Sequence, residues 1–254
     1  MFTLSVVIPA FNEARRIAGT VRDVLSEVDR WCHRCEVLVV DDGSTDGTAA
    51  VVSRLSRDGL PVRLLRHDRN RGKGAALRAG VAESRGALVL LTDADLATPV
   101  AEIGRLLGRI ADGADIAIAS RAAPGARILA HQAPLREMSG RAFNRLVQMT
   151  LLPGIQDTQC GFKLFRGPEA RALFAECIVD GYAADVEVLS LARRAGLGIA
   201  EVPVVWSHVQ GSKVRLFTDG VRMGAELADI WRRHTLQPAP LPQFTMAPGH
   251  AATR

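Results

Sequence analysis

The sequence contains little cysteine, few aromatic residues and no long apolar run, and each shortage argues against a class of protein. Four cysteines in 254 residues are too few for a disulfide-stabilised scaffold, which predicts reduced thiols and a cytoplasmic location. Aromatic residues make up 5% of the chain, too few for a platform that stacks nucleic-acid bases. No run of about 18 apolar residues occurs, so we expect neither a membrane-spanning segment nor a signal peptide.

Lysine is also scarce. It accounts for three of the 32 basic residues, at positions 73, 163 and 213, and the others are arginine. A lysine ammonium is a compact charge, so these three positions are candidates for charge-dependent sites, with random placement as the alternative. The net charge of +5 is spread along the chain, which suits anionic small molecules or an acidic membrane surface and does not indicate nucleic-acid binding.

Runs rich in Val, Ile and Leu alternate with helical patterns over the first 120 residues. This alternation predicts an α/β domain with a mostly parallel sheet and helices on both faces. Thr98 is expected to cap one helix, with Pro99 as its first residue. Such sheets bind ligands at the carboxyl ends of their strands, which here carry "PAFNE", "DDGSTD", "RNRGKG", "DAD" and "SR". The expected strands cover 4–9, 36–42, 62–67, 87–93 and 114–120, and the first helices 13–28 and 45–57.

The pattern changes after Arg121. Residues 122–134 are interpreted as a loop, 157–166 as a turn leading into a strand, and 198–206 as a further strand; helices are expected over 135–151 and 214–234. We expect one domain over residues 1–234, with halves 1–121 and 122–234, and a disordered tail over 235–254.

Two short motifs restrict the chemistry. The first strand ends in "PAFNEARR", without the G-x-G-x-x-G of dinucleotide-binding domains, which argues against a nicotinamide-dependent dehydrogenase. The fourth strand is followed by Asp93 and Asp95. Residues two apart in a strand face the same way, so both carboxylates could hold one divalent cation. A helix cap beside a solvated aspartate is the alternative; a dehalogenase-type phosphatase is disfavoured because its D-x-D follows the first strand.

In this order and spacing, "VVIPAFNE", "VVDDGSTDGT", "NRGKGAALRAG", "TDADL" and "ASR" resemble the inverting glycosyltransferases of family 2, which have the Rossmann-like GT-A fold. Beyond residue 121, "DTQCGFKLF", "DVEVL" and a tryptophan followed by "GSK" are similar to the dolichyl-phosphate β-glucosyltransferase branch, beside the polyprenyl-phosphate mannose synthases. The resemblance covers about residues 4 to 230.

The resemblance implies a nucleotide-sugar site at the ends of the first two strands. Asp41 and Asp42 would accept hydrogen bonds from the edge of the base, which both uracil and guanine can donate. Ala94, between the two aspartates of the D-x-D, belongs to the same site. The other residues expected there are Pro9, Ala10, Asn12 and Glu13.

The resemblance also implies how the diphosphate is held. Asp93 and Asp95 would bind Mg²⁺ or Mn²⁺ against it, with Asp95 counted among the catalytic residues. Arg71 and Lys73 stand beside glycines, where backbone can approach a phosphate. Lys213 would close over the leaving diphosphate from a mobile loop.

The acceptor side follows from the same resemblance. Arg121, Arg136 and Ser139 would hold a lipid phosphate, although an ordinary solvated helix face is the alternative for Arg136. A phosphate acceptor needs no general base, whereas a hydroxyl acceptor does, and Asp157 is then the candidate, with Asp185 and Glu187 behind it. In this view Asp157→Asn lowers turnover and leaves sugar-nucleotide binding intact.

The helical pattern over 214–234 is amphipathic. Its apolar stripe would lie at a membrane interface or pack on the rest of the domain, and we favour packing. The stripe consists of Phe217, Val221, Gly224, Ala228 and Trp231, with Leu216, Met223, Leu227 and Ile230 beside it.

The expected function is therefore inverting, metal-dependent transfer of a hexose, with UDP-glucose as the expected donor, onto a polyprenyl or dolichyl phosphate. A peripheral position at the inner face of the cell membrane is expected with it. GDP-mannose as donor, a soluble hydroxyl acceptor, and a non-catalytic sugar-nucleotide-binding module are the alternatives. The sequence alone distinguishes neither the base nor the acceptor, nor the oligomeric state.

Overall fold

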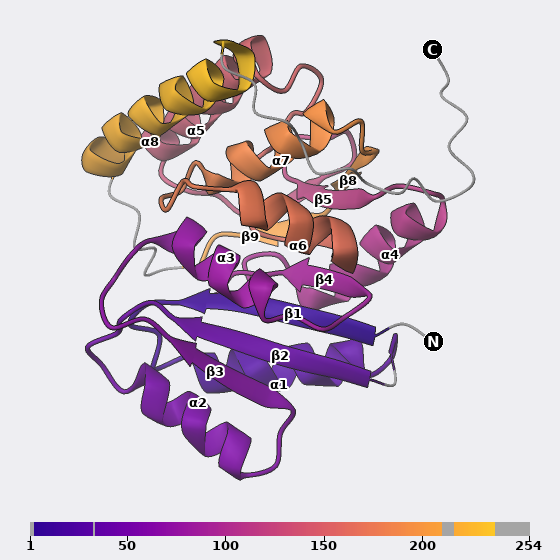
Figure 1. Ribbon diagram of the computed structural model, residues 1–254, viewed down its shortest axis with the longest axis vertical. Helices are drawn as coiled ribbons and strands as arrows, with labels where there is room; N and C mark the ends of the chain where they lie inside the picture. The colour runs from indigo at the N-terminus through magenta and orange to yellow at the C-terminus, as the bar shows by residue number, and fades with distance from the viewer. Residues whose placement is uncertain (1–2, 33, 210–215, 237–254) are drawn as a thin grey trace.

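The computed structural model describes residues 3–32, 34–209 and 216–236. They form a central β-sheet with helices around it (Figure 1). Within these residues the sheet has seven strands in the order β3-β2-β1-β4-β7-β5-β8. Only β7 runs antiparallel to its neighbours, so the predicted mostly parallel sheet is confirmed. The strands are β1 (Thr3–Ala10), β2 (Arg34–Asp41), β3 (Val62–Arg66), β4 (Leu88–Leu91), β5 (Ile116–Ser120), β7 (Lys163–Arg166) and β8 (Ile199–Pro203).

Helices cover both faces of the sheet, as predicted. Alternate residues of each strand point to opposite faces, so that in β1 Val7 packs into one apolar core, and Val6 and Ile8 into the other. One core is covered by α1 (Ile17–Val28), α2 (Thr48–Arg57) and α4 (Ile103–Ala111). The other is covered by α3 (Lys73–Ala82), α6 (Gly167–Glu176) and α7 (Ala184–Arg194), with α5 (Pro134–Thr150) and α8 (Leu216–Trp231) beyond them.

Two of the predicted helix starts are too early, because the residues before α1 and α2 form the loops of the site instead. Glu13 donates its backbone N–H to Thr48 Oγ1 (2.8 Å). A third start was also wrong. Pro99 has an extended ψ of 139°, and a 3-10 turn at Val100–Glu102 precedes α4. Thr98 is buried beside Cys160 Sγ (3.4 Å) and does not cap the helix.

The segment 122–134, predicted as a loop, contains a strand. β6 (Arg127–Ala130) pairs in parallel with β9 (Val205–Ser207) in a separate two-stranded sheet. The predicted strand over 198–206 is accordingly divided between β8 and β9. The four residues of β6 show no strand pattern of their own, because β9, the strand with which they pair, is distant in sequence.

The apolar stripe of α8 faces outward, contrary to our prediction. Val221 is 77% exposed, and Gly224, Ala228 and Trp231 are also exposed. The neighbouring row packs inward instead, with Leu227 and Ile230 in the core. The side chain of Phe217 lies outside the described residues, as does the predicted tail from residue 237 onward. No helix in the described part of the chain combines the length and hydropathy needed to cross a bilayer.

Candidate active site

The loops after β1 and β2 are bound to each other at the carboxyl edge of the sheet. Asn12 adopts a positive φ of 57°, a conformation that asparagine tolerates better than most residues. Its N–H donates to Ser44 Oγ (2.8 Å), and its Oδ1 accepts from the N–H of Thr45 (2.9 Å). The side chain of Asn12 therefore holds the loop after β2, on the rim where the nucleotide was predicted to bind.

Asp42 holds the next loop in place. Its Oδ2 accepts from the N–H of Gly72 (2.8 Å), and its Oδ1 accepts from the N–H of Arg71 (2.9 Å). His67 Nδ1 lies 2.7 Å from the same Oδ1. Both oxygens of Asp42 thus fix the loop that precedes Lys73, rather than facing open space.

The two carboxylate oxygens of Asp41 differ in their hydrogen-bond partners. The side chain is fully buried, and Oδ1 accepts from the N–H of Ser44 (2.9 Å). Oδ2 lies 3.3 Å from Arg66 Nε but makes no hydrogen bond with any described residue. Of the two aspartates predicted to contact a base, Asp41 is therefore the one with an oxygen that accepts no hydrogen bond from a described residue.

Asp93 and Asp95 follow β4 in a turn, so the strand predicted to continue to residue 93 ends two residues earlier, at Leu91. Ala94 is buried between these two half-buried side chains, and the charge of Asp93 acts on Asp95. Asp95 Oδ1 accepts from the N–H of Ala97 (3.1 Å). Burial and the charge of Asp93 raise the pKa of Asp95. These two effects disfavour the ionised form of Asp95, which a nearby cation would stabilise.

Asp93 and Asp95 fit a divalent cation whose remaining ligands would come from the substrate. No cluster of three or more His, Cys, Asp or Glu side chains suited to a metal is found among the described residues. Mg²⁺ commonly uses one or two carboxylates together with substrate phosphates, which matches Asp93 and Asp95. Gly161 leaves the space that Asp93 occupies, since a Cβ at position 161 would lie 2.0 Å from Asp93 Oδ2.

Lys73 lies beside Asp93. It is also held by Asp185, which forms a buried ion pair with Lys163. Lys73 Nζ is 2.9 Å from Asp93 Oδ1 and 3.6 Å from Asp185 Oδ2. The other oxygen of Asp185 is 2.5 Å from Nζ of Lys163, which also donates to the carbonyl of Cys160 (2.6 Å). Burial opposes the ammonium form, but Asp93 and Asp185 outweigh it and raise the pKa of Lys73. A permanent positive charge therefore stands beside the two aspartates.

Arg121 and Asp157 form a bidentate ion pair within reach of the charge of Asp93. Arg121 Nε and Nη2 donate to the two carboxylate oxygens of Asp157 (2.7 and 2.9 Å). The guanidinium lies over the ring of Trp206, 5.4 Å from its centroid. Burial alone would raise the pKa of Asp157, but the charge and hydrogen bonds of Arg121 lower it to about 2. Asp157 is therefore a weak proton acceptor at neutral pH.

The remaining predicted acceptor residues lie on α5. Arg136 is half-buried and Ser139 exposed in the first turns of this helix. Asn144 connects α5 to the turn of Asp157, because its Oδ1 accepts from the hydroxyl of Thr158 (3.1 Å). Lys213 lies outside the described residues, so its role stays a prediction.

Several residues of the site were not among those predicted from the sequence. His67 braces Asp42, Gly161 makes room for Asp93, and Trp206 lies under Arg121. Lys163 was singled out only because lysine is rare, and its pairing with Asp185 was not foreseen. Each of these contacts joins segments that are distant in sequence, so no local spacing could have indicated it.

Comparisons with known proteins agree with this architecture. The family model described as "Glycosyl transferase family 2" matches residues 5–168. A dolichyl-phosphate beta-glucosyltransferase of Trichomonas vaginalis is 36% identical over 234 residues, which are 88% of this chain and 69% of that protein. The dolichyl-phosphate beta-glucosyltransferase of Homo sapiens is 36% identical over 244 residues, covering 91% of this chain and 75% of that protein.

Solved structures share the fold. Mannosyl-3-phosphoglycerate synthase from Rubrobacter xylanophilus superposes with a TM-score of 0.70 at 22% identity, over 96% of this chain and 77% of that one. Glucosyl-3-phosphoglycerate synthase from Mycobacterium tuberculosis, in complex with Mn²⁺, UDP-glucose and phosphoglyceric acid, gives 0.68 at 20% identity, over 91% and 80%.

Proposed function

The chain belongs to glycosyl transferase family 2, and from this premise we propose that it transfers glucose from UDP-glucose to a polyprenyl phosphate. It is a glycosyltransferase with the GT-A fold, as the sequence motifs predicted. The donor is supported by the UDP-glucose complex of a protein with the same fold, and the acceptor by the relatives named dolichyl-phosphate beta-glucosyltransferases.

The donor diphosphate is proposed to bind at Asp93, Asp95 and Lys73. A divalent cation held by the two aspartates would neutralise charge that develops on the departing nucleoside diphosphate. Lys73 supplies a fixed ammonium next to them, already oriented by Asp93 and Asp185, so that little reorganisation is needed during the reaction. Arg71 belongs to the same loop, which Asp42 holds in place. Asp41 keeps its proposed role toward the base.

The ion pair of Asp157 with Arg121 is the observation that favours a phosphate acceptor. A phosphate monoester already carries a charge of about −1.5 to −2 near neutral pH and can attack the anomeric carbon without a base. Its oxygen forms the new bond as the bond from that carbon to the diphosphate breaks, which inverts the configuration. A hydroxyl acceptor would need a base, and Asp157 with a pKa of about 2 serves poorly. We assign acceptor-phosphate binding to Arg121, with Arg136 and Ser139 in support.

A lipid acceptor requires contact with a membrane, and one face of the molecule suits it. Of the ten large apolar side chains that are exposed among the described residues, seven lie on α5, α8 or the turn after α8. On α5 they recur at helical spacing along one outer stripe. The residues of this α5/α8 face are Leu135, Met138, Leu146, Met149, Val221, Trp231 and Leu236.

The charge and placement of the α5/α8 face agree with a bilayer that carries anionic lipids. The two helices lie side by side at one end of the molecule (Figure 1). Arg141, Arg222 and Arg232, on the same two helices and the turn after α8, are also well exposed. Apolar side chains flanked by arginines bind the headgroup region of such bilayers. We therefore propose peripheral attachment at the cytoplasmic membrane face.

A label-transfer experiment tests the proposed function. The protein is incubated with vesicles containing polyprenyl phosphate and with UDP-glucose or GDP-mannose labelled in the sugar, in the presence of Mn²⁺, Mg²⁺ or a chelator. We expect butanol-extractable label from UDP-glucose that depends on a divalent cation. Label from GDP-mannose alone would replace the donor assignment, and label confined to the aqueous phase would exclude the lipid acceptor.

A further inference from the structure

The backbone of Lys73 rests against loop 177–183, which joins α6 to α7. The carbonyl of Asp180 accepts from the N–H of Gly74 (2.8 Å), at the start of α3. Gly72 has a φ of 112°, and a Cβ there would lie 2.3 Å from the same carbonyl oxygen. Lys73 is thus flanked by two glycines that fit closely onto this loop. The position of loop 177–183 therefore determines where α3 starts and where the Lys73 side chain originates.

Glu187 holds loop 177–183 from inside the protein. Its side chain is fully buried, and Oε2 accepts from the backbone N–H groups of Ile178 (3.0 Å) and Val179 (2.8 Å). Its other oxygen, Oε1, accepts from Nη1 of Arg233 (2.9 Å), in the turn that follows α8. A buried carboxylate needs such a partner, because an uncompensated charge in the interior is strongly unfavourable. Arg233 thus supplies the opposite charge beside Glu187 and helps to hold its side chain in place.

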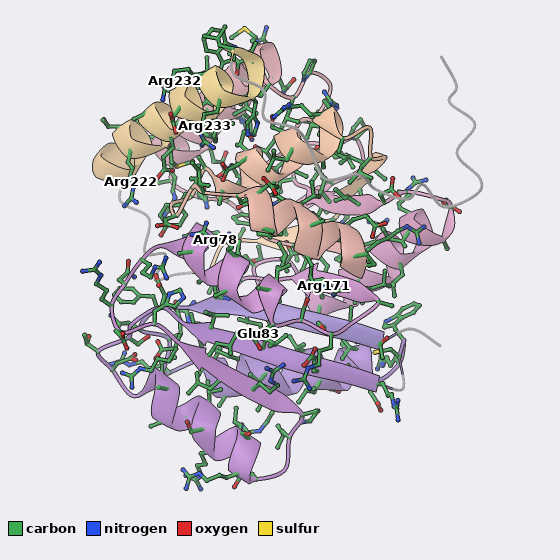
Figure 2. The ribbon with its side chains drawn as sticks, in the orientation of Figure 1. Arg78, Glu83, Arg171, Arg222, Arg232 and Arg233 are labelled. Atoms are coloured by element: carbon green, nitrogen blue, oxygen red, sulfur yellow. The ribbon has the colours of Figure 1, made fainter. Side chains whose placement is uncertain are left out.

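Helix α8 itself also contacts the same loop. Glu226 Oε2 accepts from the N–H of Ala183 (3.2 Å). A Cβ at Gly181 would lie 2.1 Å from Glu226 Oε1, so the helix and the loop are closely packed. Arg222 of α8 donates to Glu226 Oε1 (2.9 Å), and Arg233 lies in the turn after this helix; both arginines are labelled in Figure 2. The C-terminal helix and the turn after it therefore hold loop 177–183 at both of its ends.

We propose that Glu187 and Arg233 are positioning residues for Lys73, so that the seating of α8 sets the donor affinity of the enzyme. The contacts run from Arg233 through Glu187 and loop 177–183 to the start of α3. Because α8 also carries part of the α5/α8 face, contact at that face is coupled to the donor site. This inference rests on the proposed function only for the identity of the donor.

Two neighbouring arginines provide a matched test. Both bind Asp229, through Arg232 Nη2 and Arg233 Nε (3.0 Å each), but Arg232 is 60% exposed, whereas Arg233 is 22% exposed and bonded to Glu187. We expect Arg233→Met to weaken binding of UDP with Mn²⁺ in calorimetry about tenfold, and to speed amide hydrogen exchange of residues 72–76 to a similar degree. Arg232→Met should change neither quantity, and Arg233→Lys should restore most of both.

The exchange measurement separates this inference from the proposed donor. Faster exchange at 72–76 in Arg233→Met, together with a wild type that binds no UDP, would support the coupling and refute only the donor assignment. Faster exchange confined to 177–183 with unchanged UDP affinity would overturn the proposal. If Arg233→Met does not fold, Glu226→Ala removes the other contact of α8 with the loop, and the same two outcomes decide.

Discussion

Helices α3 and α5 are both placed beside the predicted substrates, but they differ in how much of each is buried. Six of the ten residues of α3 are buried, whereas Val147 is the only buried residue among the seventeen of α5. The donor side is fixed by hydrogen bonds between short loops, such as those of Asp42 to Arg71 and Gly72. The acceptor side instead presents an apolar face to its surroundings. The proposed donor side is therefore braced by contacts within the chain, whereas the proposed acceptor side leaves apolar side chains exposed.

The largest effect is expected from Asp95→Asn. Loss of one carboxylate from the proposed cation site should lower cation-dependent glucose transfer by about 100-fold or more, because charge on the leaving diphosphate is no longer neutralised. Transfer rates measured over a range of Mn²⁺ concentrations test this, with circular dichroism as the check on folding. A variant with normal rates at wild-type Mn²⁺ concentrations would remove Asp95 from the site.

The next largest effect is expected from Lys73→Met. It should weaken donor binding by about 10- to 100-fold, because the ammonium bonded to Asp93 and Asp185 is lost. Lys73→Arg keeps the charge but not the compact shape, so we expect it to recover only part of the affinity. Calorimetry with UDP and Mn²⁺ measures both variants. Equal affinity in the wild type and Lys73→Met would show that the donor side is not built around this lysine.

A smaller effect is expected at the α5/α8 face. Replacing Met138 and Met149 by Glu should reduce sedimentation with anionic vesicles by about tenfold, since two apolar contacts are replaced by repelled charges. Trp31→Glu, at an exposed apolar residue of the donor half, serves as the control and should leave sedimentation unchanged. UDP binding should remain normal in all these proteins. Equal losses in the control and the double variant would mean that α5 does not form the docking face.

The smallest effect concerns stability in acid. The pKa of Asp157 is lowered from 3.8 to about 2 in the folded protein, so the unfolded chain binds more protons between these values. The stabilising contribution of the carboxylate is therefore complete above about pH 4 and disappears as the pH falls toward 2. We expect Asp157→Asn to melt a few degrees below the wild type at pH 6, with the gap closing in acid. A gap independent of pH would contradict the ion pair with Arg121.

The sequence predicted the donor side far better than the acceptor side, and the reason is physical. Strands with continuous apolar runs, each followed by polar residues at one edge, are local patterns, and they correctly placed Asp42, Lys73 and Asp93 on one rim. The resemblance to family 2 rested on those same segments. What local patterns could not indicate was pairing across the chain, such as β6 with β9, or Lys163 with Asp185.

The orientation of α8 illustrates the same limit. Its two apolar rows are neighbours on the helix surface, and a helical pattern alone does not show which of them faces the protein. The core contains Leu227 and Ile230, which leaves Val221 and Trp231 outside. Only the position of the neighbouring elements decides between the two rows. The outward row then becomes evidence for a partner, which the sequence alone could not supply.

The central claim is that a cation joins Asp93 and Asp95 to the diphosphate of an activated sugar. A crystal structure of the protein with Mn²⁺ and UDP-glucose, with the anomalous signal of manganese recorded, tests it most directly. We predict a manganese peak in contact with both carboxylates and with the diphosphate oxygens, and Lys73 beside the same diphosphate. Manganese bound elsewhere, with both aspartates turned away from the nucleotide, would contradict the account.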